Sequence, residues 1–241
     1  MGPFDNLFNK KENGQNNFLP EDIKPFTSEP EFLEKFGALA LDKQRNLYAI
    51  IEDKAWSVDM AKEEICFGGG ITFPIQVLGS YAYSSETWLW IWDNVAGGYA
   101  QSIMQQALAL KKYGEANNVD LLTIGKFDAT NSDLHLIGMV ASEMFNSGAY
   151  YLADYGQGIM VVTVKANLID QFEYDEHLRI LTVFPEFIST FEVNHKTALT
   201  NYLTSKGYQI EENNLGLSAT KNGKTIKAEF DELSRLTKLN G

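Results

Sequence analysis

Residues 86–94 read Glu86-Thr87-Trp88-Leu89-Trp90-Ile91-Trp92-Asp93-Asn94 and place three of the four tryptophans of the chain at every second position. Side chains of a β-strand alternate between the two faces of its sheet. This spacing therefore predicts that the three indoles share one face and that Leu89 and Ile91 share the other. A strand that is apolar on both faces is typical of a central position, so the stretch predicts a sheet centred on residues 88–92.

The tryptophan face has two interpretations. Three indoles could form a wall for a cation, a sugar or a peptide, because ring faces attract cations and indole N–H groups donate hydrogen bonds. Two polar residues, Glu86 and Asn94, lie an even number of positions from the tryptophans, so in a strand they would share the same face and complete this wall. The candidate ligand-binding residues are therefore Glu86, Trp88, Trp90, Trp92 and Asn94. The alternative is that the rings fill the core beneath a helix, and the sequence favours it because large aromatic side chains dominate cores.

Composition limits the partners that the chain can have. With 241 residues, 44% of them hydrophobic, it is long enough for one large domain or two small ones. A net charge of -12 repels nucleic-acid phosphates and anionic membrane surfaces, so neither is expected as a partner. A basic protein or a small neutral or cationic ligand remains.

Cysteine usage and hydropathy predict a soluble cytoplasmic protein. The single cysteine, Cys66, excludes an intramolecular disulfide and a zinc site with several cysteines, and it is expected to be a buried, inert thiol. The chain has no signal-peptide pattern, and no window approaches the ~20 apolar residues of a membrane span.

The order of patterns along the chain predicts its domains. Residues 1–27 are expected to be a flexible arm, residues 28–170 the main domain, and residues 177–241 a C-terminal α+β extension that is separate or part of the same domain. A capping box of Ser28 and Glu31 predicts a helix that runs to about Ile51. On this helix Asp42, Lys43 and Arg45 are expected to face water.

The remaining patterns alternate between strands and helices. Strands are predicted over 56–60, 64–67, 71–78, 87–92, 120–127, 149–153 and 159–164, with an interrupted strand over 178–191 and a hairpin turn at Asn222-Gly223. Helices are predicted over 99–113, 134–145, 195–205 and 231–239, with Gly114 ending the first and Thr130–Asp133 capping the second. The fold class is therefore α+β, with a mostly antiparallel twisted sheet covered by helices.

No known catalytic motif occurs with its required context. The triple glycine at 68–70 precedes a strand-like run, so it indicates a hairpin turn rather than a phosphate loop. His135 is expected to be structural or exposed, and no metal site or cofactor is expected. Carboxylates near predicted strand ends could serve acid–base chemistry, although a chain with 32 acidic residues produces such candidates by chance. They are Glu63, Glu64, Glu86, Asp93 and Asp128.

Residues 75–94 carry a resemblance to a known family. Leu78-Gly79-Ser80, followed by Thr87-Trp88-Leu89-Trp90-Ile91-Trp92-Asp93-Asn94, resembles a family of uncharacterised bacterial proteins known only as a domain of unknown function. The likeness covers about residues 30–165 and implies no activity or catalytic residues.

Two functions follow as expectations. The first is non-catalytic binding of a partner protein or small ligand, for which an immunity-like role against a basic toxin is one form. The alternative is an enzyme or small-molecule binder with a pocket beside the strand of Trp88 to Trp92.

Overall fold

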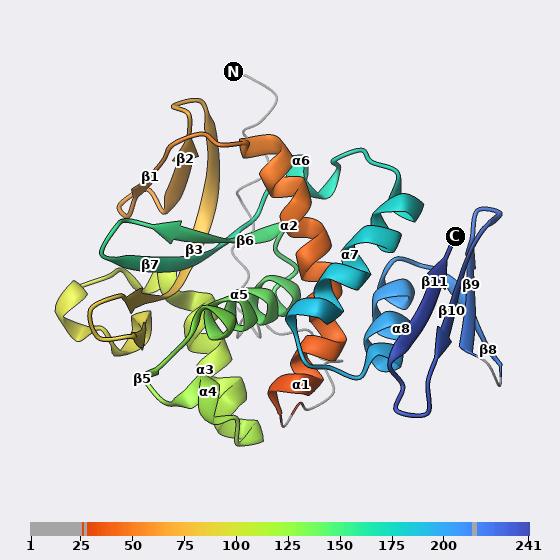
Figure 1. Cartoon of the computed structure of the whole chain (residues 1–241). Helices are drawn as coiled ribbons and strands as arrows, with labels where there is room; N and C mark the ends of the chain where they lie inside the picture. Colours follow the sequence, from red (N-terminus) through yellow and green to blue (C-terminus); the bar gives the residue numbers. More distant parts are fainter. Residues whose placement is uncertain (1–25, 27, 214–215) are drawn as a thin grey trace, which may run out of the picture.

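A computed structural model describes Phe26, residues 28–213 and residues 216–241. Its strands form a seven-stranded sheet and a four-stranded sheet, and helices pack against both (Figure 1). The predicted α+β class is confirmed. The arm predicted for residues 1–27 lies outside the described residues, apart from Phe26. The division into residues 28–170 and 177–241 stays a prediction.

The large sheet is antiparallel throughout and is organised by its longest strand. Its strands are β1 (Trp56–Asp59), β2 (Glu64–Phe67), β3 (Ile71–Ala82), β4 (Thr87–Trp90), β5 (Lys126–Asp128), β6 (Ala149–Asp154) and β7 (Gly158–Val164). Strand β3 pairs with β2 and β4 along one edge and with β7 along the other. The centre of the sheet is therefore β3, and the tryptophan strand β4 lies beside it, between β3 and β5.

The first helix begins and ends where the sequence predicts. It is continuous through α1 (Glu29–Phe32), a π-helical turn (Leu33–Gly37) and α2 (Ala38–Ile51). The predicted capping box is absent, because the Ser28 side chain makes no capping hydrogen bond. The cap predicted at Thr130–Asp133 is confirmed: it is a capping box that starts α5 (Asn131–Met144), with the Thr130 N–H donating to Asp133 at 2.6 Å. Helices α2 and α5 both contact β6.

The segment after β4 differs from the prediction. Single 3-10 turns (Val95–Gly97 and Gln101–Met104) precede α3 (Gln105–Asn117), which continues past Gly114. The helix ends at its C-cap Asn118, whose φ angle of 57° is left-handed, and Gly114 instead allows close contact with a short helix, α4 (Asp120–Thr123), where an added Cβ would be 2.6 Å from Leu122. The strand predicted over 120–127 is wrong, and only the three residues of β5 pair with β4.

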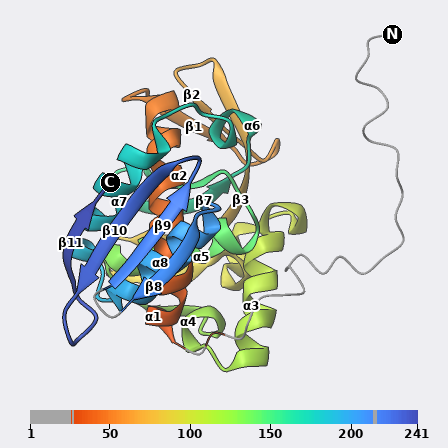
Figure 2. The same cartoon turned by 90° about the vertical axis from the view of Figure 1, so that its right-hand side faces the viewer.

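The C-terminal part contains α6 (Asn167–Asp170), α7 (Glu176–Thr190), α8 (His195–Ser205), β8 (Gln209–Asn213), β9 (Gly216–Lys221), β10 (Lys224–Phe230) and β11 (Leu236–Asn240). Helices α7 and α8 lie between α2 and the small sheet of β8 to β11 (Figures 1 and 2). Helix α8 and the turn at Asn222-Gly223 confirm the sequence predictions, and both turn residues have positive φ angles.

Two C-terminal predictions are wrong. Residues 178–190 are helical, because the Asp175 carboxylate caps α7 at His177 and Leu178 and the buried residues follow the helical period. Residues 231–239 do not form a helix, since the Asp231 carboxylate accepts the N–H groups of Leu233 and Arg235 in a turn, and β11 then pairs with β10.

The position of two further side chains corrects the sequence analysis. Asp42 does not face water: it is 1% exposed and pairs with Arg179 of α7 at 3.2 Å and with Lys206 after α8. Cys66 is only half-buried, because Ile65 and Phe67 take the buried positions of β2 and leave Cys66 on the other face.

Candidate functional site

Trp88 and Trp90 belong to the core. Neither ring is exposed, the two pack edge to face at 5.3 Å, and the Trp90 indole N–H donates to the Leu121 carbonyl oxygen at 3.1 Å. Gly79 on β3 makes room for them, because a Cβ there would lie 2.5 Å from the Trp88 ring and 2.4 Å from the Leu89 carbonyl oxygen. The two rings thus take the place that the core interpretation gives them.

The other three candidate residues lie at different places around these rings. The strand ends at Trp90, and Trp92 lies half-buried in a 3-10 turn (Ile91–Asp93). Its ring stacks on the Trp90 ring at 6.2 Å, and Lys111 Nζ lies 4.2 Å from its centroid. Glu86 is exposed in the β3–β4 turn with a φ angle of 52°. Asn94 lines a pocket that lies on the opposite face of the sheet and that the other four candidates do not line.

The pairing of the strands decides which side chains lie on the face opposite Trp88 and Trp90. Leu89 of β4, Ser80 of β3 and Met160 of β7 are partners in adjacent strands, so their side chains share a face. The register between β3 and β7 shifts between Val77 and Gly79, which leaves Leu78 without a partner on β7. This bulge keeps Val77 on the same face as Ser80 and turns Leu78 into the core.

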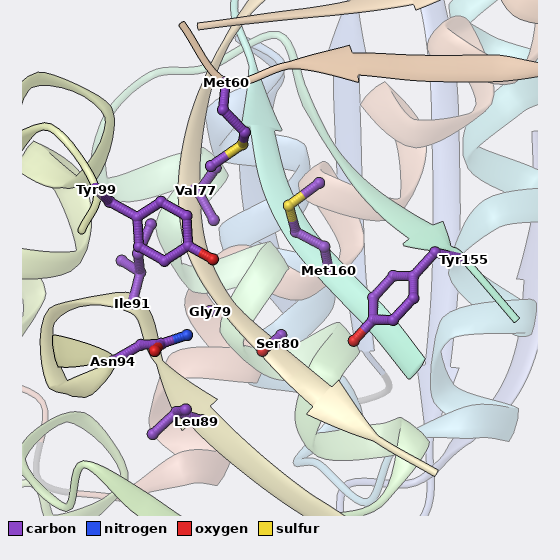
Figure 3. Close-up of a pocket in the computed structure, with 10 residues that line it drawn as sticks. All are labelled: Met60, Val77, Gly79, Ser80, Leu89, Ile91, Asn94, Tyr99, Tyr155 and Met160. Carbon is purple, nitrogen blue, oxygen red and sulfur yellow. The ribbon is translucent and has the colours of Figure 1, made fainter. Parts of the chain in front are cut away.

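A pocket of about 160 Å³ lies over this face (Figure 3). Its walls come from three strands of the sheet and from loops at residues 60, 91–99 and 155. The lining residues are Met60, Val77, Gly79, Ser80, Leu89, Ile91, Asn94, Tyr99, Tyr155 and Met160. They include no charged side chain, no histidine and no cysteine, so the pocket combines apolar walls with neutral polar groups.

Four polar side chains of the pocket are available to a ligand. Within the described part of the chain, the hydroxyls of Ser80, Tyr99 and Tyr155 and the amide of Asn94 make no hydrogen bond to protein. Figure 3 shows the two tyrosines on opposite sides of the pocket, with their hydroxyls directed toward its middle. Burial raises the pKa of Tyr155, with further increases from Tyr99 and Asp154, so its phenol is protonated and can donate at neutral pH.

Two glycines leave room for the tyrosine rings. A Cβ on Gly97 would lie 2.1 Å from the Tyr99 ring, and a Cβ on Gly158 would lie 2.6 Å from the Tyr155 hydroxyl. The rings therefore occupy space that any larger residue at these positions would fill. Sequence reasoning missed both tyrosines, although a tyrosine beside closely spaced glycines in a loop is a signal that could have found them.

The candidate carboxylates are dispersed around the sheet. Glu63 accepts a hydrogen bond from Ser102, Glu64 begins β2, and Asp128 ends β5. Asp93 packs against Gly125. Among the described residues, no three His, Cys, Asp or Glu side chains gather closely enough to hold a metal ion. His135 contacts the Tyr150 hydroxyl at 2.8 Å, which is a structural role.

Comparison with known families covers the region that contains the pocket. A family described as of unknown function, DUF6882, matches residues 30–166, which is more than half of the chain. The chain belongs to the DUF6882 family. All of the pocket residues lie within the DUF6882 match, whereas α7, α8 and the small sheet lie outside it. No curated protein and no solved structure matches the chain. None of the helices that the structure describes is long and apolar enough to cross a membrane.

Proposed function

We propose that this protein is a binding protein and that the pocket over Ser80 and Leu89 accepts one uncharged, ring-sized group. The observation that carries the proposal is the set of four neutral polar side chains without protein partners, held between apolar walls. This arrangement is typical of ligand sites, where a few polar groups orient a ligand that apolar surface retains. Acid–base side chains do not line the pocket, so binding is the function that its chemistry supports best.

The size of the pocket limits the occupant. A volume of about 160 Å³ is close to the ~150 Å³ of an engineered apolar cavity that holds benzene. One six-membered ring therefore fits, whether it belongs to a small molecule or to an aromatic side chain of a partner. The thioethers of Met60 and Met160 are flexible and make favourable contacts with aromatic rings, so they can adjust to such a group.

The pocket methionines supply a direct test. We expect p-cresol, the side chain of tyrosine, to shift the ¹³C-methyl NMR signals of Met60 and Met160 in a saturable way, with a dissociation constant of about 1 mM. Signals of the buried Met139 and Met144 should not move, and they report on the fold in the same spectra. The absence of a shift at Met60 and Met160 at saturating p-cresol would contradict the proposal.

Two variants separate the pocket from the rest of the surface. Ser80→Leu should fill the pocket and abolish the shifts, whereas Ser205→Leu, at an exposed position in α8, should leave them unchanged. Asn94→Ala removes one orienting amide and should weaken p-cresol binding about five-fold, the usual effect of one hydrogen bond. Equal binding by Ser80→Leu and the wild type would place the ligand elsewhere.

A further inference from the structure

Apolar surface continues outward from the pocket. Val95 is 89% exposed and directly follows Asn94, and Tyr155 is 49% exposed. Tyr83, 42% exposed, packs edge to face on Tyr81 and donates to Asp154 at 2.8 Å, next to Tyr155. A single ring in the pocket would leave Val95 and Tyr83 uncovered. Exposed apolar groups that are contiguous with a pocket and rimmed by polar groups mark contact with a larger partner.

Two carboxylates and one lysine lie around this surface. Asp93 precedes Asn94 and is exposed, with its carboxyl beside Gly125, just before β5, and with no hydrogen bond or ion pair among the described residues. Asp154 is exposed and accepts hydrogen bonds from Gly156 N–H and Tyr83, which fix its carboxylate beside Tyr155. Of the bases nearby, Lys62 pairs with Asp59 at 2.9 Å. Lys126 on β5 is exposed, shares a face with its partner Leu89 and makes no ion pair among the described residues, so the two carboxylates outnumber the one free base. With a net charge of -12 over the whole chain, the surface favours positive charge around the pocket.

We infer that the natural occupant is a basic protein segment that inserts one aromatic side chain into the pocket and places lysine or arginine residues beside Asp93 and Asp154. This inference rests on the proposed function. The inserted ring contacts the walls and the four polar groups (Figure 3), while the flanking residues cover Val95 and Tyr83. Charge complementarity of this kind accelerates association and selects the partner.

Matched peptides test the inference. We would titrate the full chain with three short capped peptides, each followed by the Met60 and Met160 methyl signals: a central tyrosine flanked by lysines, the same tyrosine flanked by glutamates, and a central alanine flanked by lysines. The lysine–tyrosine peptide should bind about five-fold tighter than p-cresol, as a few exposed ion pairs allow. Its advantage should shrink as salt rises from 50 to 500 mM.

Two double variants test whether the preference for lysine-flanked peptides comes from Asp93 and Asp154. Asp93→Asn with Asp154→Asn should remove the preference for lysine over glutamate flanks and leave p-cresol binding unchanged, because asparagine can still accept from Tyr83. Glu173→Gln with Glu192→Gln has the same net charge and alters exposed residues outside the pocket elements, so it should retain the preference.

Three outcomes would overturn the inference. If p-cresol binds but lysine and glutamate peptides bind equally, the pocket is a small-ligand site and the proposed function stands alone. If the lysine–alanine peptide matches the lysine–tyrosine peptide, the attraction is non-specific charge. If neither p-cresol nor any peptide moves the methionine signals, the proposed function fails as well.

Discussion

The carboxylate of Asp42 lies 3.2 Å from the guanidinium of Arg179 and also pairs with Lys206, although Asp42 and Arg179 are 137 positions apart in the sequence. The Tyr202 hydroxyl donates to the same carboxylate at 2.9 Å. Asp42 is 1% exposed and Arg179 is also largely buried, so water does not replace these contacts. This cluster joins the first helix, inside the family region, to the helices that follow it.

Replacing Asp42 by asparagine tests how strongly the cluster joins these parts. Asp42→Asn leaves the buried Arg179 without an ion-pair partner among the described residues and leaves Lys206 with only Glu176, 3.8 Å away, and removing one partner of a buried ion pair costs about 3–5 kcal/mol. We expect a loss of this size in the free energy of unfolding, measured by urea denaturation. Asp53→Asn, at an exposed position just after α2, should change it by less than about 0.5 kcal/mol. Equal effects of the two changes would show that the cluster contributes nothing specific.

Glu143 predicts a pH dependence of stability. Burial raises its pKa from 4.5 to about 7, although Lys43 lies 3.0 Å from one carboxylate oxygen, and Asp170 and Asp42 raise it further. The other oxygen, Oε1, has no hydrogen-bond partner. Between pH 4.5 and 7 the folded state therefore holds more protons than the unfolded chain, and this group makes the fold less stable as pH rises.

The expected size follows from this difference in pKa. Between pH 5 and 8 Glu143 should remove about 2 kcal/mol from the free energy of unfolding. Urea denaturation over this range should show a steeper fall for the wild type than for Glu143→Gln, which cannot titrate and otherwise keeps the same neighbours. Parallel curves for the two proteins would mean that Glu143 titrates normally.

Gly97 predicts how the pocket responds when the ring of Tyr99 moves. In Gly97→Ala the new Cβ overlaps the Tyr99 ring, which is half in solvent and can rotate away, so the fold should lose less than about 1 kcal/mol. Binding of p-cresol should weaken several-fold, because one wall and one donor leave the pocket. The matched change Gly70→Ala, where a Cβ meets nothing within 4 Å, should leave binding unaltered. An unaltered affinity in Gly97→Ala would remove Tyr99 from the site.

Local signals predicted much of the fold. The polar cluster at Thr130–Asp133 caps α5, Asn222-Gly223 closes a hairpin, and residues 149–164 form the hairpin that two strand-like runs on either side of Gly156-Gln157-Gly158 predict. Each signal depends on neighbours within a few positions. Helix α7 was missed because its dense apolar residues resemble a strand, although the cap at Asp175 marked the helix start.

Features that depend on contacts between residues far apart in the sequence could not be predicted from these local signals. The alternation of Trp88, Trp90 and Trp92 continues in the sequence beyond Trp90, but the backbone turns into a 3-10 conformation there, so Trp92 is not part of the strand although its ring stacks on Trp90. Burial of Asp42 depends on cations that arrive from α7 and α8. The pocket depends on a bulge at Leu78 and on loops that meet only after folding. Of its lining residues, only Asn94 was among the candidate ligand-binding residues of the sequence analysis.

Gly37 predicts a stability coupling between the first helix and α7. It lies in the π-helical turn, where an added Cβ would be 2.3 Å from the buried ring of Phe187. Alanine would favour the helix by about 0.5–1 kcal/mol, but overpacking costs about 1–3 kcal/mol. Because the Phe187 ring is fully buried and cannot swing into solvent, overlap should dominate and Gly37→Ala should destabilise the fold.

The double variant separates overlap from other effects. Phe187→Leu alone should destabilise the fold by leaving a cavity, whereas Gly37→Ala with Phe187→Leu should lose less than the sum of the two single changes, since the alanine methyl fills part of that cavity. Urea denaturation of the four proteins would measure this coupling. Additive losses would show that the two residues act independently and that the close approach of the first helix to α7 does not limit the size of residue 37.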